Sequence, residues 1–216
     1  MTFHIPAHFR EDDRAALERF VEAHAFGTLV SAGPAGISVS HLPFLPQRDG
    51  GERVGDGSLR LLGHMARANA HWRELEAAGE VLVIFQGPHA YVSPGAYCHH
   101  PSVPTWNYAT VHARGRARLL PEVDLAPLLA RLSAAYEEGR PSPWRMDALP
   151  APFAETMMRA IVGFEIAVAS LEGKFKLSQN RRPEDVEGVA AALAAEGQAE
   201  LAAMMRARAV RPPESR

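Results

Sequence analysis

The segment from Gly63 to Asn69 combines residue types that suit a phosphate group. Its pattern predicts that a strand ends, a turn of small residues follows and a helix begins. Free backbone N–H groups at such a place favour an anion. Arg67 would add a bidentate clamp and Asn69 a neutral donor. The alternative is that Asn69 only caps the helix and that the guanidinium group of Arg67 is solvated.

A second candidate is the run of Trp106, Asn107 and Tyr108. In a strand, alternation places Trp106 and Tyr108 on the opposite side from Asn107. An aromatic pair beside an amide suits a flat heteroaromatic ligand, which would stack and accept an edge hydrogen bond. The same pattern also suits an ordinary core that contains one satisfied polar group.

The only two lysines of the chain, Lys174 and Lys176, lie in a donor-rich segment that also contains Gln179 and ends at Arg181. In an extended segment both lysines fall on one face, and these side chains could bind phosphate or ribityl hydroxyls. An ammonium and a guanidinium group are not interchangeable at a tight site, so lysine in an arginine-rich chain indicates a geometric demand. The alternatives are a polar turn, genome composition and, for Lys176, neutralisation of a carboxylate.

The segment from His41 to Phe44 stands at the end of a predicted strand. Pro43 donates no ladder hydrogen bond, which predicts that this strand lies at an edge or is interrupted. An interrupted strand exposes the backbone groups of its neighbours, including Leu42, to a ligand.

The consecutive residues Cys98, His99 and His100 have side chains that metals favour, but adjacent residues point in different directions and no fourth ligand is spaced to match. We therefore expect a solvated loop and no metal. Cys98 is also the only cysteine, which excludes an intrachain disulfide and fits a reducing cytoplasm.

The chain has 216 residues and a formal net charge of −2, so it lacks the basic field of a nucleic-acid-binding domain. No apolar run approaches the roughly 20 residues that span a membrane. The first residues also lack the pattern of a secretory signal. These features predict a cytoplasmic protein without a membrane partner.

About seven short strands separated by turns are expected to carry these residues. Hairpins dominate and strands do not alternate regularly with helices, which favours an α+β fold built on a closed antiparallel barrel with helical additions. A polar surface loop is expected from Gln47 to Ser58. Helices are expected over Asp12–His24, Ala66–Ala78, Val123–Glu138 and Phe153–Ala160, and from Pro183 onward.

The same motifs carry a family likeness. The runs His41-Leu42-Pro43-Phe44, Gly63-His64-Met65-Ala66-Arg67-Ala68-Asn69, Val103-Pro104-Thr105-Trp106-Asn107-Tyr108 and Lys174-Phe175-Lys176-Leu177-Ser178-Gln179-Asn180-Arg181 resemble the PaiB-like FMN-binding negative transcriptional regulators. The likeness runs in order from about His4 to Gly188.

The resemblance implies an antiparallel split β-barrel of the flavin reductase and pyridoxamine-phosphate oxidase type, with peripheral helices. It implies a homodimer with FMN at the subunit interface. We expect a split-barrel domain over residues 1–180 and a C-terminal helical extension over residues 181–216. The cofactor-binding residues that the resemblance implies are His41, Leu42, His64, Met65, Ala66, Arg67, Asn69, Trp106, Tyr108, Lys176 and Gln179.

Within that likeness, Arg67, Asn69 and the backbone around Met65 would hold the phosphate, and His41 and Leu42 would meet the ring. Trp106, Tyr108, Lys176 and Gln179 would complete the pocket from the same or the other subunit. Lys176 is expected close to the flavin or its phosphate, and Lys174 is expected to be exposed.

Two further functions stay open. A flavin-dependent oxidoreductase of a small substrate could use His64, His112 or Tyr108 to move protons while the flavin carries out the redox chemistry. A DNA-binding regulator would rest on the small basic cluster of Arg206, Arg208 and Arg211, although no helix–turn–helix pattern is present.

Overall fold

The computed structural model describes residues 3–34, 36–50 and 57–209. Contacts divide the chain into two compact units, which we call the first and the second unit. The first unit comprises Met1–Asp13, Gln86–Val111 and Glu172–Arg216. The second unit comprises Arg14–Phe85 and His112–Leu171.

One antiparallel sheet supplies the framework of the fold. Its strands follow the order β3-β2-β6-β7-β8-β5-β4, and β1 pairs separately with β8. Strands β6, β7 and β8 each have residues in both units. The strands are β1 (Arg10–Glu11), β2 (Phe26–Gly33), β3 (Gly36–Pro43), β4 (Leu45–Asp49), β5 (Ser58–Ala66), β6 (Glu80–Val92), β7 (Thr105–Leu119) and β8 (Ile161–Lys176).

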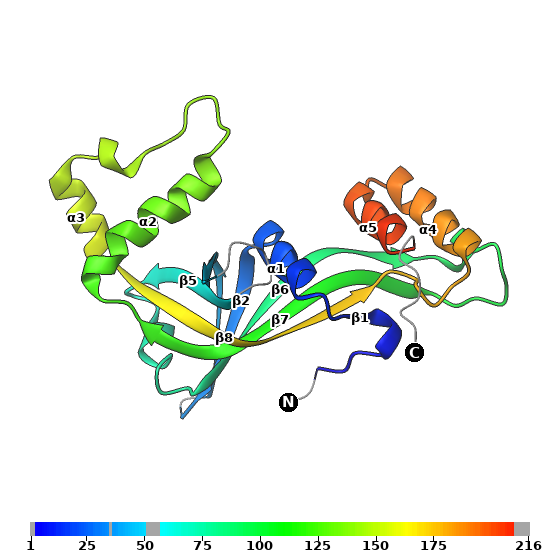
Figure 1. The fold of residues 1–216 in the computed structure, drawn as a ribbon, viewed down its shortest axis with the longest axis horizontal. Helices are drawn as coiled ribbons and strands as arrows, with labels where there is room; N and C mark the ends of the chain where they lie inside the picture. Colours follow the sequence, from blue (N-terminus) through cyan, green and yellow to red (C-terminus); the bar gives the residue numbers. More distant parts are fainter. Residues whose placement is uncertain (1–2, 35, 51–56, 210–216) are drawn as a thin grey trace. The chain divides into compact units, whose positions relative to one another are not determined.

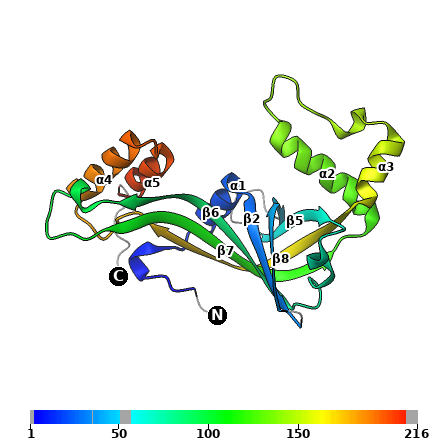
Figure 2. The same ribbon diagram turned by 180° about the vertical axis from the view of Figure 1, so that it is seen from behind.

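Five α-helices and four short 3₁₀ helices accompany the sheet in the described ranges. In the first unit, α4 and α5 lie side by side in both views (Figure 1 and Figure 2). The α-helices are α1 (Arg14–Ala23), α2 (Glu122–Glu137), α3 (Ala151–Arg159), α4 (Pro183–Ala195) and α5 (Ala199–Ala209). The 3₁₀ helices are η1 (Ala7–Phe9), η2 (Ala70–Arg73), η3 (Pro94–Ala96) and η4 (Met146–Ala148). No helix of the described residues combines the length and the apolar character needed to cross a bilayer.

The core of the second unit follows from alternation along its strands, which turns every other residue inward. Leu29, Leu61 and Phe164 are fully buried there. Gly63 on β5 allows the ring of Phe164 to approach the backbone closely, because a Cβ at this position would stand 2.8 Å from the ring. The end of β5, where the candidate phosphate site begins, is therefore tightly packed against β8.

The core of the first unit forms between the sheet and the two C-terminal helices. Phe175, Val189, Leu201 and Met205 are buried, as is Asn107 of β7. Asn107 donates through Nδ2 to Ser178 Oγ at 2.9 Å and to the sulfur of Met205 at 3.4 Å. The polar group that alternation placed opposite the two aromatic rings is thus satisfied inside the core.

The prediction of a helix over Ala66–Ala78 is wrong. β5 continues to Ala66, and only the 3₁₀ turn η2 follows. The side chain of Asn69 caps η2 by accepting the N–H of His71, and the indole of Trp72 donates to the carbonyl of Arg67 before the cap.

Two other predicted boundaries concern loops and domains. The loop expected from Gln47 starts later, since β4 extends to Asp49, and residues 51–56 of it lie outside the described residues. The division into residues 1–180 and 181–216 stays a prediction. The helix predicted from Pro183 is confirmed, with Glu184 and Asp185 in its first turn.

Candidate functional site

The predicted cofactor-binding residues fall into two groups, one in each unit. The first-unit group is Trp106, Tyr108, Lys176 and Gln179. The second-unit group is His41, Leu42, His64, Met65, Ala66, Arg67 and Asn69. Each group is described by itself.

Arg67 directly follows β5 and is held by backbone carbonyls. Its Nε donates to the carbonyl of Arg159 at 2.9 Å, and its Nη2 donates to that of Ile161 at 3.2 Å. The side chain is still 45% exposed, and Glu122 lies 3.9 Å from it as a highly exposed carboxylate. The guanidinium group is therefore oriented by the chain and keeps further N–H groups for an anion.

The backbone of this turn offers less to an anion than the sequence predicted. The N–H of Arg67 donates to the carbonyl of Ala160, and that of Asn69 donates to the carbonyl of Ala66. Asn69 caps η2 through Oδ1, and its Nδ2 donates to Ser40 at 3.0 Å. The capping alternative thus describes Asn69, and anion binding here would rest on the side chain of Arg67.

His71, which the sequence analysis did not single out, connects this turn to the β2–β3 hairpin. It is 4% exposed, with Nδ1 2.8 Å from Ser40 Oγ and Nε2 2.9 Å from Ser31 Oγ. A neutral imidazole has one N–H donor and one acceptor nitrogen, so in either tautomer it donates to one of these two serines and accepts from the other. Burial lowers the pKa of His71, and the Glu74 carboxylate offsets only part of that effect.

The other members of the second-unit group on β5 differ in environment. Met65 is in the core, whereas Ala66 is exposed. His64 is half-buried, and its Nδ1 is shielded from solvent without a hydrogen-bond partner among the described residues. Burial lowers the pKa of His64. An orphaned ring nitrogen two residues before the Ala66–Arg67 turn fits a site that a bound group completes.

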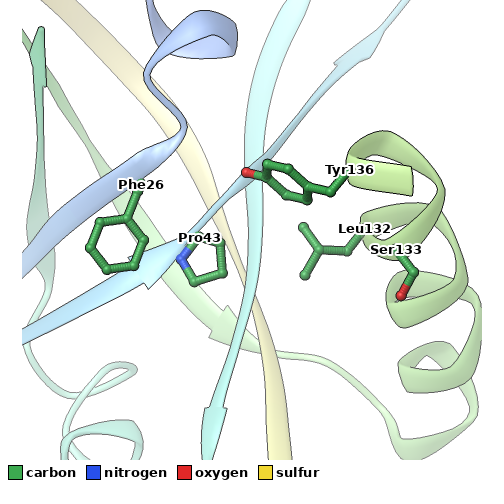
Figure 3. Close-up of a pocket in the computed structure, with 5 residues that line it drawn as sticks. All are labelled: Phe26, Pro43, Leu132, Ser133 and Tyr136. Atoms are coloured by element: carbon green, nitrogen blue, oxygen red, sulfur yellow. The ribbon is translucent and has the colours of Figure 1, made fainter. Parts of the chain in front are cut away.

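His41 and Leu42 lie near the end of β3, which is an outer strand of the sheet, as Pro43 predicted. The pairs Thr28–His41 and Phe26–Pro43 follow each other on one face of the hairpin, and Thr28 Oγ1 lies 3.0 Å from His41 Nδ1. Beside them is an apolar pocket of about 390 Å³ between the hairpin and α2 (Figure 3). Its lining residues are Phe26, Pro43, Leu132, Ser133 and Tyr136.

In the first-unit group, Lys176 donates to Thr105 Oγ1 and, at 2.8 Å, to the carbonyl of Trp106. Burial, and then the charges of Lys174 and Arg181, lower its pKa. The alternative that Lys176 neutralises a carboxylate is not what the described residues show, because they contain no such ion pair.

Lys174 is half-buried, so the prediction that it is exposed is wrong. Its Nζ donates to the carbonyl of His4 at 3.1 Å and lies 5.5 Å from the ring centre of Tyr108 and 5.9 Å from that of Phe3. The N-terminal segment, which the sequence analysis did not connect with β8, supplies these contacts.

Gln179 shapes its own turn. Its Oε1 accepts from the N–H of Leu177 at 2.7 Å, and its Nε2 donates to the carbonyl of Phe175. Both ends of the amide group are thus engaged within the chain.

Trp106 is 54% exposed and lies in an aromatic cluster on one face of the sheet. The centre of its ring is 6.1 Å from that of Tyr91 and 6.5 Å from that of His89, both on β6. Sequence reasoning had missed His89 and Tyr91, because their closeness to Trp106 depends on the pairing of β6 with β7.

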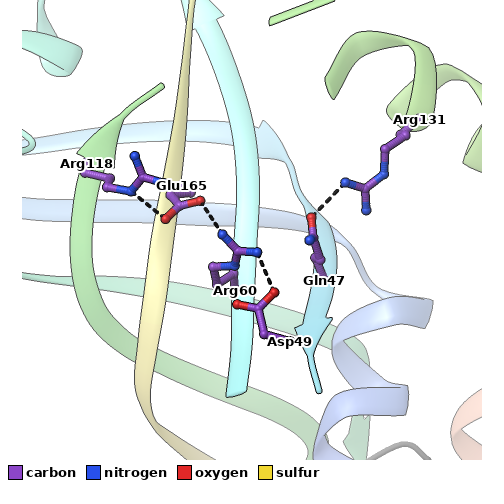
Figure 4. Close-up of polar contacts among 6 residues, drawn as sticks. All are labelled: Gln47, Asp49, Arg60, Arg118, Arg131 and Glu165. Carbon is purple, nitrogen blue, oxygen red and sulfur yellow. Dashed lines mark hydrogen bonds and ion pairs between the residues drawn. The ribbon is translucent and has the colours of Figure 1, made fainter. Parts of the chain in front are cut away.

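A polar cluster in the second unit provides a contrast (Figure 4). The buried carboxylate of Glu165 accepts from Arg118 at 2.7 Å and from Arg60 at 3.1 Å, and Arg60 also pairs with Asp49. Arg131 donates to Gln47 at 2.7 Å. Carboxylates compensate the charges of Arg60 and Arg118, so this cluster is not an anion site.

The loop with Cys98 and His99 is tied to α4. The carboxylate of Asp185 accepts from the backbone of Cys98 at 2.7 Å, from that of His99 at 3.0 Å, and from His99 Nδ1 at 3.2 Å. No group of three or more His, Cys, Asp or Glu side chains in the described ranges could hold a metal ion.

The basic cluster of the C-terminal helix is compensated where it is described. Arg206 forms a bidentate pair with Glu187, and Arg208 pairs with Glu11 and donates to the carbonyl of Arg10. Arg211 lies outside the described residues. Neither described arginine is available as a free phosphate contact.

Solved structures confirm the predicted split-barrel fold. The flavocytochrome Anf3 of Azotobacter vinelandii superposes with a TM-score of 0.60 at 16% identity, covering 84% of this chain and 77% of that one. The FAD and heme binding protein of Mycobacterium smegmatis gives a TM-score of 0.59 at 15% identity, covering 82% and 78%.

Sequence comparisons identify the family. The family model described as "Putative FMN-binding domain" matches residues 3–170. The "Protease synthase and sporulation protein PAI 2" of Bacillus subtilis (strain 168) is 37% identical over 186 residues, which cover 86% of each chain. An uncharacterised protein of Emericella nidulans is 33% identical over 187 residues, which cover 71% of this chain and 73% of that protein. The chain therefore belongs to the PaiB-like family of FMN-binding proteins, and its cofactor is FMN.

Proposed function

We propose that the chain is a cytoplasmic regulator of the PaiB type that forms a homodimer and holds FMN where the two subunits meet. The regulatory role is inferred from the family likeness, and the Bacillus relative is itself named for protease synthesis and sporulation. FMN, when bound, supplies redox chemistry through its isoalloxazine ring.

The observation that carries the proposal is the open apolar pocket beside His41. Phe26 in its wall is 66% exposed, and the face of the hairpin next to it carries the exposed Ile37 and Val39. Exposure of such an apolar surface to water is unfavourable for a monomer. A flat ring and a second subunit would cover it.

The second-unit group supplies the anchor in this proposal. Arg67 would bind the phosphate through the N–H groups that the carbonyls of Arg159 and Ile161 leave over. His41 and Leu42 would meet the ring at the strand end, and the orphaned Nδ1 of His64 would gain a partner.

The first-unit group of the other subunit would complete the pocket. Trp106 and Tyr108 would contribute ring faces and Lys176 a positive charge. Gln179, whose amide is engaged in its own turn, would act by holding the segment that carries Lys176.

The test compares FMN with riboflavin, which lacks the phosphate. In Arg67→Ala, we expect FMN binding to weaken by about 1.5–3 kcal/mol, the scale of a lost charge-assisted hydrogen bond, while riboflavin binding changes little. Arg73→Ala is the matched control, since Arg73 lies nearby over the ring of Trp72. Equal losses for both ligands would show that Arg67 only supports the structure through its two carbonyl bonds.

The environment of His64 favours a second candidate function, a flavin-dependent oxidoreductase. A histidine with a lowered pKa and an unpartnered nitrogen can accept a proton beside a flavin. Bleaching of the bound flavin by NAD(P)H would support this candidate. A salt-sensitive shift of promoter DNA would instead support direct regulation.

A further inference from the structure

The first unit contains a group of cations without carboxylate partners. No acidic side chain of the described residues forms an ion pair with Lys174, Lys176 or Arg181. They contact carbonyl and hydroxyl oxygens and aromatic rings instead. This differs from Arg60, Arg118 and Arg206, each of which is paired with a carboxylate. In a chain with a formal net charge of −2, uncompensated cations in one place indicate a missing anion.

The geometry of the two lysines leaves room for such an anion. An ammonium group has three N–H donors. Lys174 uses one on the carbonyl of His4, and Lys176 uses two, on Thr105 and on the carbonyl of Trp106. The bonds of Lys176 hold its ammonium group beside the backbone of Trp106 and leave its third N–H for an anion.

The aromatic cluster adjoins these cations. Trp106, Tyr91 and His89 form an exposed group on β6 and β7, and Tyr108 on β7 touches Lys174. Exposed aromatic rings offer stacking surfaces for another flat ring. The same part of the first unit therefore presents ring faces on two strands and positive charge on the next strand, β8.

We propose that this face of the first unit binds a planar aromatic anion, stacked on Trp106 between Tyr91 and His89, with its negative group on Lys176 and Lys174. The proposal rests on the proposed function in one respect, because this face would close the flavin pocket of the other subunit. The anion would then be the substrate or effector of the flavin site, and its class follows from the face itself: one or two fused rings carrying a carboxylate or a phosphate.

The experiment uses the flavin-loaded protein and two probes that share a ring system, 2-naphthoate and the neutral 2-naphthalenemethanol. Binding is measured by titration calorimetry. We expect naphthoate to bind at least about tenfold more tightly than the alcohol, which corresponds to about 1.4 kcal/mol. In the double variant Lys174→Gln/Lys176→Gln this advantage should vanish, whereas Trp106→Leu should weaken both probes alike.

Two matched control variants remove a cation and an indole ring from other positions of the chain. Arg116→Gln takes away an exposed cation of β7, and Trp144→Leu takes away a half-exposed indole. Both variants should bind naphthoate as the parent does. The proposal would be overturned if the parent bound naphthoate and the alcohol with equal affinity, or bound neither probe. It would also be overturned if the control variants lost as much affinity for naphthoate as the site variants.

Flavin content, followed by its visible absorption, separates this proposal from the proposed function. Naphthoate binding that persists in protein stripped of flavin supports the anion site, even if the Arg67→Ala test fails. Displacement of naphthoate by FMN, one molecule for one, would overturn the proposal, because the face would then be the site of the flavin itself.

Discussion

At the scale of single residues, His71 shows how a buried neutral side chain determines a local structure. Its two ring nitrogens bond Ser40 and Ser31, one as donor and one as acceptor, and both serines are buried. A second proton on the ring would remove the nitrogen that accepts from one of these hydroxyl groups, in addition to placing a charge in the interior.

The lowered pKa of His71 predicts how stability depends on pH. In the unfolded chain His71 takes up a proton below about pH 6.5, whereas in the folded chain its lowered pKa keeps the ring neutral to a lower pH. The free energy of unfolding should therefore fall as the pH drops from 7 to 5. His71→Phe should cost about 1–3 kcal/mol at pH 7, since it leaves buried hydroxyls unpaired. It should also reduce the pH dependence, and His64, with the same sign of shift, should account for part of what remains.

Urea unfolding at pH 7, 6 and 5 measures both effects. The exposed His100 provides the control variant, His100→Gln. An unchanged slope in His71→Phe would contradict the assignment of a neutral imidazole.

Ser178 gives a second prediction at this scale. Its φ of +66° is a conformation that favours glycine, and its hydroxyl group bonds Asn107 in the core. Ser178→Ala should destabilise the protein, because it keeps the strained backbone and leaves the Asn107 amide with one partner fewer. Ser178→Gly should be about 1–2 kcal/mol more stable than Ser178→Ala, which thermal unfolding can resolve. Equal stability of the two variants would show that the turn relaxes.

Single residues also mark the limit of what the sequence predicts. Residue chemistry alone predicts Arg67 and Lys176 as anion contacts, because guanidinium and ammonium groups in donor-rich segments suit anions. Asn69 and Gln179 were selected by the same reasoning, yet each amide is engaged in a turn of its own. Whether an amide side chain binds a ligand or stabilises a turn depends on the backbone conformation around it. Residue type alone does not predict that conformation.

At the scale of elements, Asp185 ties α4 to the loop at Cys98. Burial alone would raise the pKa of this carboxyl group, but hydrogen bonds from His99 and Cys98 outweigh burial and hold it below its usual range. A lowered pKa means that the ion contributes stability above about pH 4, and that this contribution is lost as the pH falls further.

Asp185→Ala should therefore lower the melting temperature at pH 7 by several degrees, because two backbone N–H groups lose their acceptor. The difference from the parent should be smaller at pH 3 than at pH 7, because the stability that the charged carboxyl group contributes is lost as the pH falls below about 4. Glu184→Ala is the matched control in the same helical turn. Calorimetry at both pH values tests this, and a difference that stays constant would assign the effect to packing.

The elements themselves were predictable where local and global preferences agree. Pro183 and the acids that follow it predict the start of α4, and Pro43 predicts an outer strand. The segment after Ala66 misled the prediction because its apolar spacing suits a helix, while the bonds of His71 to Ser31 and Ser40 on the β2–β3 hairpin are tertiary contacts that spacing does not reveal.

At the scale of the whole molecule, the exposed face of the β2–β3 hairpin predicts a dimer. Phe26, Ile37 and Val39 are all exposed apolar side chains of this hairpin. Light scattering at micromolar concentration should give twice the mass of the chain. Val39→Glu should shift the mass toward that of a monomer, because the interface would have to bury an unpaired charge.

Val123→Glu is the control, since Val123 on α2 is also exposed. A parent protein that is monomeric, or a control as disruptive as Val39→Glu, would contradict the assignment of this face.

The interleaving of the two units along the chain has a consequence for biosynthesis. The second unit has all of its residues once Leu171 has been added, whereas the first unit starts at the N-terminus and is complete only after α4 and α5. A chain emerging from the ribosome can thus finish the second unit while Ile5 and Phe9, which are buried in the complete protein, still lack the later residues of the first unit. Termination between Leu171 and Pro183 would leave the second unit whole and the first unit without α4 and α5, and no single continuous fragment of the chain contains the first unit alone.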